Sequence, residues 1–153
     1  MSASLESPGV FREGAENGTR GGRAPQFPSC DEMKVELRKT FQFEAAHLLP
    51  NLPKSHKCRR LHGHSFHAEI VVAGQCDPKL GWLMDYAVIS EAFKPLWEQL
   101  DHRYLNEIRG LDNPTSENIA VWIWERLKPT LPSLSEVVVA ETCMARCVYR
   151  GAA

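Results

Sequence analysis

The sequence lacks several features that mark large classes of protein. No apolar run approaches the ~20 residues that a membrane-spanning helix needs, and the first residues hold no apolar segment of a secretory signal. The formal net charge is −1, so the strong basic excess of nucleic-acid-binding domains is also missing. We therefore expect neither a membrane protein, nor a secreted protein, nor a nucleic-acid binder.

A disulfide framework is missing as well. The chain has five cysteines, an odd number at irregular spacings, whereas disulfide-stabilised domains carry paired cysteines. We therefore expect free thiols and a reducing, cytoplasmic location. Apolar residues make up 43% of the chain and charged residues 24%, which is typical of a globular protein.

Large apolar residues are sparse in the first part of the chain. Residues 1–32 instead contain five glycines and three prolines. Such a segment cannot bury enough apolar surface to offset the entropy lost on ordering. We predict a disordered N-terminal extension over residues 1–32 and a single domain over residues 33–151.

Alternation of apolar and polar residues predicts the strands. One runs over 33–47, where Phe43 and His47 share a face, with a bulge expected near Lys39. A second runs over 61–73, and its even positions share a face. Two shorter strands are expected over 135–142 and 147–150.

Apolar residues at helical spacing predict two helices between these strand pairs. The first begins after Asp85, a good N-terminal cap, and contains Pro95, which is expected to kink or shorten it. The second begins at Thr115 or Ser116 and ends before Pro129. The resulting order is strand, strand, helix, helix, strand, strand, which is an α+β arrangement.

Histidines are concentrated around the start of the second strand. His62 and His64 stand two apart, so both point to one face, and His47 ends the preceding strand on the matching face. Three imidazole ligands with an open fourth position are typical of a catalytic zinc site. Cys58 lies next to them, either as an acid–base group or as a fourth ligand that would make the site structural. His67 has the other parity and is not counted as a ligand.

Acidic residues outside this cluster are further candidates. Glu141 interrupts an apolar strand, and its carboxylate could grip two parallel N–H groups of a pterin-like or guanine-like edge. Asp101 and His102 place a carboxylate beside an imidazole at a helix end. The basic loop 54–60, which includes Arg60, is a candidate contact for a phosphate group.

These residues resemble the 6-pyruvoyl-tetrahydropterin synthase family over residues 33–151. The short gap between Cys58 and His62 favours its 6-carboxytetrahydropterin synthase branch, which belongs to queuosine biosynthesis. The motifs that carry the resemblance are Phe43–His47, Cys58–His64, Leu100–Asn106, Asn113–Glu117 and Glu141–Cys143.

The resemblance implies the tunnelling fold, an α+β fold. In it a four-stranded antiparallel sheet carries two helices on one face. Three subunits close their sheets into a β-barrel, and two such trimers stack into a homohexamer. Closure of the barrel would remove the exposed strand edges of a single sheet.

The resemblance also implies a chemistry. His47, His62 and His64 would hold Zn²⁺, and Cys58 would be the general base. The implied enzyme is a carbon–carbon lyase acting on 7,8-dihydroneopterin triphosphate. Its products would be 6-carboxy-5,6,7,8-tetrahydropterin, acetaldehyde and triphosphate. The alternatives are a pyruvoyl-type synthase that eliminates triphosphate, and a non-catalytic zinc- or pterin-binding module.

Further roles follow from the same resemblance. Asp101 and His102 would tune Cys58 or relay its proton, and Glu141 would anchor the pterin and join the relay. Thr115 and Ser116 would contact the pterin from a neighbouring subunit.

Overall fold

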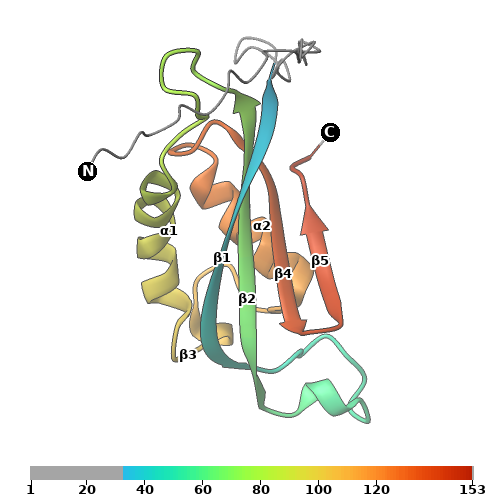
Figure 1. Ribbon diagram of the computed structural model, residues 1–153. Coiled ribbons are helices and arrows are strands. Elements are labelled where there is room, and N and C mark those ends of the chain that lie inside the picture. The colour runs from blue at the N-terminus through green and yellow to red at the C-terminus, as the bar shows by residue number, and fades with distance from the viewer. Residues whose placement is uncertain (1–32, 153) are drawn as a thin grey trace, which may run out of the picture.

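A five-stranded sheet with two helices on one face forms the computed structural model, which describes residues 33–152 (Figure 1). The sheet order is β3-β1-β2-β4-β5, and all pairings are antiparallel except β1 with β3. The predicted fold class is therefore confirmed, whereas the extension predicted over 1–32 lies outside the described residues. The elements are β1 (Lys34–His47), β2 (His62–Gln75), α1 (Tyr86–Leu100), β3 (Arg103–Tyr104), α2 (Ser116–Leu127), β4 (Leu134–Thr142) and β5 (Ala145–Tyr149), with short 3₁₀ turns η1 (Lys57–Arg59) and η2 (Leu105–Glu107).

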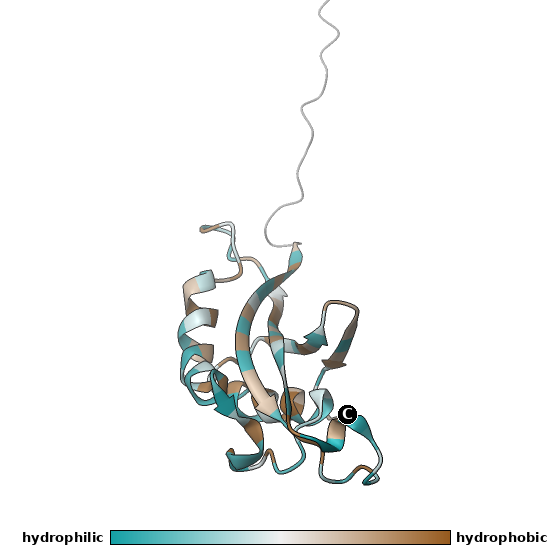
Figure 2. Ribbon diagram, turned by 90° about the horizontal axis from the view of Figure 1, so that it is seen from below, coloured by the Kyte–Doolittle hydropathy of each residue, from teal (hydrophilic) through white to brown (hydrophobic). Residues whose placement is uncertain are grey.

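The long β1–β2 ladder fixes the position of the site. Its pairing runs without interruption from Lys34 opposite Gln75 to His47 opposite His62. Hydrophilic and hydrophobic bands alternate along β1 (Figure 2), as expected for a strand with one buried face. The bulge predicted near Lys39 is wrong, because Lys39 keeps the buried-face parity and sends its ammonium group to helix α1. There it donates to the Tyr86 carbonyl at 3.2 Å and to the Ser90 hydroxyl.

Both helices begin where the sequence predicted. Asp85 caps α1 by accepting from the Ala87 N–H at 2.8 Å, and Thr115 caps α2 by accepting from the Asn118 N–H at 3.3 Å. Pro95 does not shorten α1, which continues to Leu100. Pro95 and Glu91 are both exposed, so water can bind the Glu91 carbonyl that loses its helical donor.

The core lies between the helices and the sheet. Phe43 and Phe66 stack there with ring centroids 5.1 Å apart, in the same buried cluster as Phe93 of α1 and Ile123 of α2. This packing positions the end of the β1–β2 ladder, because the same face that carries these apolar residues carries the three histidines farther along.

The other face of the sheet carries a network of ion pairs. Arg38 contacts Glu69 at 2.7 Å, Glu136 at 3.0 Å and Glu36 at 3.1 Å, and Arg150 contacts Glu136 at 2.6 Å. These carboxylates raise the pKa of Arg38 above its usual value, Glu69 most of all. Glu136 is 5% exposed, and its pairing with two guanidinium groups accounts for a carboxylate at that depth.

Two strand edges remain unpaired within residues 33–152. The short strand β3, which the sequence did not predict, pairs with β1 only at Ala45 and Ala46. Residues 34–40 of β1 and the outer edge of β5 therefore have free backbone groups, whereas farther along β1 Trp97 donates to the Gln42 carbonyl and His102 to the Glu44 carbonyl. No helix in this part of the chain combines the length and apolar character needed to cross a membrane.

Candidate active site

Three imidazoles converge at the end of the β1–β2 ladder. His47 and His62 form its last pair, and His64 lies two residues farther along β2 on the same face. One nitrogen from each of the three lies within 4.8 Å of the others, and no other described residue joins this group. The structure therefore brings the predicted ligands together and leaves out His67, as expected.

Hydrogen bonds fix the tautomers of two of these rings. The Nδ1 of His47 donates to the Pro114 carbonyl at 2.8 Å, and the Nδ1 of His62 donates to the Arg60 carbonyl at 2.7 Å. A carbonyl only accepts, so each Nδ1 carries the proton and each Nε2 presents a lone pair. Backbone carbonyls behind a ligating imidazole are typical outer-shell partners of a metal.

The two Nε2 atoms of His47 and His62 lie 3.1 Å apart. Two lone pairs facing each other repel, and a cation between them removes the repulsion. Burial lowers the pKa of His47, which keeps the ring in its neutral, metal-binding form. The neutral rings and inward-facing lone pairs of these histidines therefore suit a metal ion.

Cys58 lies outside this group of ligand atoms but faces the same space. A cavity of about 600 Å³ is lined by Cys58, His62, His64 and Glu141, together with Lys57 and Arg60. Within the described residues no fourth ligand atom joins the three imidazoles, an arrangement typical of a catalytic rather than a structural site. The sequence did not single out Lys57 within the basic loop.

The loop that carries Cys58 is held by its own backbone and by Arg59. The Leu49 N–H donates to the Cys58 carbonyl at 2.9 Å, and the Arg59 guanidinium donates to the carbonyls of Pro50 and Leu52. The Cys58 N–H in turn donates to Nδ1 of His56 at 3.1 Å. His56 thus caps the turn η1, a structural role.

Glu141 enters the cavity through an irregularity in β4. Ala140 pairs with Arg146 and Thr142 pairs with Ala145, so Glu141 is an extra residue between the two pairs. Bulges of this kind turn a side chain relative to the strand. The Glu141 side chain lies on the histidine side, close enough for its charge to act on His47.

Asp101 and His102 form a hydrogen-bonded pair, and His102 lines a different cavity. Asp101 ends α1, and His102 adopts a left-handed backbone with φ 54°, which lets neighbouring side chains meet. The Asp101 carboxylate accepts from His102 Nδ1 at 2.8 Å and from the Glu44 N–H at 3.0 Å. These bonds, that from Glu44 foremost, hold the pKa of Asp101 below its usual value.

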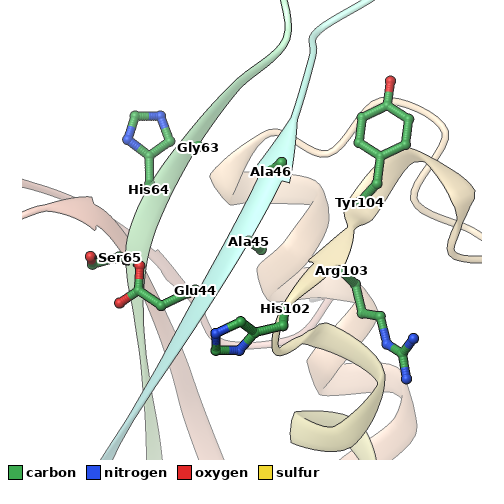
Figure 3. A pocket seen from close by; sticks show the side chains of 9 residues that line it. All are labelled: Glu44, Ala45, Ala46, Gly63, His64, Ser65, His102, Arg103 and Tyr104. Atoms are coloured by element: carbon green, nitrogen blue, oxygen red, sulfur yellow. Dashed lines mark hydrogen bonds between the residues drawn. The ribbon is translucent and has the colours of Figure 1, made fainter.

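This second cavity has a volume of about 560 Å³ and contains Glu44, Ser65 and Tyr104 besides His102. Figure 3 shows the His102 ring directed towards Glu44, while Arg103 points away from β1 and His64 points away from Ser65. Within one chain, therefore, His102 does not line the cavity of Cys58.

Of the remaining predicted substrate contacts, one lies in the Cys58 cavity and two do not. Arg60 lines the Cys58 cavity, whereas Thr115 and Ser116 do not line it within one chain. The Thr115 hydroxyl caps α2 directly after Pro114, whose carbonyl holds His47.

The comparisons with known proteins agree with this geometry. The family model described as 6-pyruvoyl tetrahydropterin synthase matches residues 36–152. A 6-carboxy-5,6,7,8-tetrahydropterin synthase from Synechocystis sp. is 44% identical over 119 residues, which is 74% of this chain and 91% of that protein. A dihydroneopterin monophosphate aldolase from Pyrococcus furiosus is 41% identical over 100 residues, 65% of this chain and 81% of that protein.

The fold has counterparts among solved structures. The 6-pyruvoyl tetrahydropterin synthase of Caenorhabditis elegans superimposes with a TM-score of 0.73 at 26% identity. The superposition covers 78% of this chain and 97% of that chain, so the likeness extends over the whole described domain.

Proposed function

The chain belongs to the 6-pyruvoyl tetrahydropterin synthase family, and from that premise we propose that it is a zinc-dependent carbon–carbon lyase. Its substrate is 7,8-dihydroneopterin triphosphate, and its products are 6-carboxy-5,6,7,8-tetrahydropterin, acetaldehyde and triphosphate. The reaction supplies a precursor of the 7-deazaguanine of queuosine. The observation that carries the proposal is the convergence of three imidazoles beside a cavity lined by Cys58 and Glu141.

Zinc is the metal that suits these ligands. His47, His62 and His64 would hold it through neutral imidazole nitrogens and leave a position for substrate. When bound, Zn²⁺ supplies Lewis-acid polarisation of substrate oxygens.

The other residues of the cavity transfer a proton and bind the two ends of the substrate. Cys58, which lies beside the ligands without joining them, takes a proton from the substrate side chain. Glu141 accepts two N–H bonds from the pterin edge, and this fixes the orientation of the ring. Lys57 and Arg60 line the same cavity and supply positive charge for the triphosphate.

A second copy of the chain completes the site. The unpaired edges of β1 and β5 are complementary in kind, since each offers free backbone groups for pairing. Asp101 and His102 lie at the β3–β1 edge, whereas Cys58 and Glu141 lie towards the β4–β5 side. Joining the edges of two copies brings His102 of one towards Cys58 of the other, and repetition of that contact closes a ring, as a trimer or stacked hexamer.

This arrangement assigns the second half of the proton path. His102, oriented by the Asp101 carboxylate at 2.8 Å, relays the proton that Cys58 takes up. Thr115 and Ser116, which do not line the Cys58 cavity of their own chain, contact the pterin held by the neighbouring copy.

Product analysis separates this function from two others within the same family. The zinc-loaded, full-length protein is given 7,8-dihydroneopterin triphosphate, and acetaldehyde, triphosphate and pterin are measured. Triphosphate without acetaldehyde would indicate the pyruvoyl-type reaction. Faster turnover of dihydroneopterin monophosphate would favour the activity named for the Pyrococcus furiosus relative. No turnover of any of these substrates would leave a zinc- or pterin-binding module.

A further inference from the structure

The side chain of Asn106 joins two segments that meet at the metal site. Its Oδ1 accepts from the Leu48 N–H at 2.9 Å, and its Nδ2 donates to the Leu48 carbonyl at 2.9 Å. The same Nδ2 donates to the Asp112 carbonyl at 3.2 Å. The amide oxygen of Asn106 and both of its N–H donors are thus hydrogen-bonded to these two segments.

The first segment is the end of β1. The β1–β2 ladder stops at His47, so Leu48 is the first residue whose backbone has no strand partner on β2. The amide of Asn106 has the N–H and C=O groups of a peptide unit, and it pairs with Leu48 as another strand residue would. This contact fixes the backbone one residue beyond His47.

The second segment leads into α2. Asp112 stands two residues before Pro114, whose carbonyl accepts from Nδ1 of His47 at 2.8 Å. Asn106 therefore fastens both ends of the hydrogen bond that sets the tautomer and ring direction of His47. His47 is fully buried, at 0% exposure, so its direction is set by the protein rather than by solvent.

We propose that Asn106 is a positioning residue of the metal centre, which acts by holding His47 against Pro114. The inference rests on the proposed zinc site, and it assigns a role to a residue that contacts neither metal nor substrate. Outer-shell partners of this kind orient the ligand and set its affinity for the metal.

Two variants of the full-length chain test the assignment, with one matched control. Asn106→Ala removes all three bonds, and Asn106→Asp keeps the size and the acceptor but removes both N–H donors. The control is Gln99→Ala, because Gln99 also donates its amide to a backbone carbonyl, that of Pro95 at 2.9 Å, but does so within helix α1 and contacts neither segment.

The measurements are zinc affinity by chelator competition, the visible spectrum of the Co²⁺-loaded protein, and circular dichroism. Both Asn106 variants are expected to remain folded, to bind zinc about 10- to 100-fold more weakly, and to show an altered Co²⁺ spectrum. Gln99→Ala is expected to match the wild type in all three.

The possible failures are distinguishable. Wild-type zinc affinity and Co²⁺ spectrum in folded Asn106 variants would overturn the inference and leave the proposed function standing. Loss of folding in both Asn106 variants, with Gln99→Ala folded, would also overturn it, since Asn106 would then support the whole domain. Absence of zinc binding in the wild type would overturn the proposed function and this inference with it.

Discussion

The Nε2 atoms of His47 and His62 face each other at 3.1 Å, each with its lone pair turned inwards by a carbonyl bound to Nδ1. The strand pairing imposes this approach, since the two residues are directly opposite on β1 and β2. Repulsion between them is relieved when a cation binds. Metal binding and stability of this end of the sheet are therefore coupled.

Removal of one ligand should abolish that coupling. Zinc at 100 times its Kd is expected to stabilise the wild type by about 2.7 kcal/mol, and to have no such effect on His62→Ala. The thermal midpoint with and without zinc measures it. His67→Ala is the control, because His67 lies on the opposite face of β2 and outside the ligand group. Equal stabilisation of the wild type and His62→Ala by zinc would contradict the assigned ligands.

Cys58→Ala distinguishes a base from a fourth ligand. We expect full zinc content with turnover reduced about 10²- to 10⁴-fold, the range typical of a lost general base. Metal analysis and a steady-state assay on the same preparation provide both values. Cys143→Ala, which alters an exposed thiol in the β4–β5 turn, should change neither. Loss of zinc from the Cys58→Ala variant would instead indicate that Cys58 is a fourth ligand of a structural site.

If a second copy completes the site, two inactive variants should regain activity when they assemble together. In mixed assemblies of Cys58→Ala with His102→Ala, about a quarter of the sites would combine an intact Cys58 with an intact His102, giving that share of wild-type activity. Co-expression followed by an activity assay measures the recovery.

The control for this experiment is a mixture of Cys58→Ala with His62→Ala. These residues line one cavity of one chain, so no site in that mixture regains both. Absence of recovery in the first mixture, with mixed assemblies verified by mass spectrometry, would contradict the shared site.

Burial of His47 makes the zinc-free protein sensitive to acid. Burial lowers the pKa of this residue below its ordinary value of 6.5, so the folded chain resists a proton that the unfolded chain accepts. Below about pH 6.5 the unfolded state binds more protons, and the free energy of unfolding falls as the pH falls towards the folded pKa. Above that pH the residue contributes no pH dependence.

Urea unfolding of the zinc-free protein across this pH range tests whether its free energy of unfolding falls as the pH is lowered. His47→Gln should show a shallower loss of stability on acidification than the wild type, whereas His67→Ala should follow the wild type. Identical pH profiles for the wild type and His47→Gln would show that His47 does not titrate in this way.

The sequence indicated those parts of the site that depend on strand parity. His62 and His64 share a face because residues two apart on a strand always do, and His47 joins them because the ladder keeps one register along its whole length. The caps Asp85 and Thr115 were likewise readable, since an N-terminal cap depends only on the residues that follow it.

Features that depend on distant contacts were not readable. The bulge that turns Glu141 arises from the pairing of β4 with β5, and the strand β3 is too short to show alternation. The bonds of Asn106 to Leu48 span 58 positions of the chain, so no local pattern indicates them. The separation of His102 from Cys58 follows from the order of strands in the sheet, which cannot be deduced from local sequence patterns.

The ratio of acetaldehyde to triphosphate released from 7,8-dihydroneopterin triphosphate tests the central claim most directly. Zinc-loaded wild-type protein is expected to release the two in equal amounts, and both signals should disappear in His62→Ala. Release of triphosphate with no acetaldehyde from the wild type, or undiminished release of both products by His62→Ala, would contradict the account.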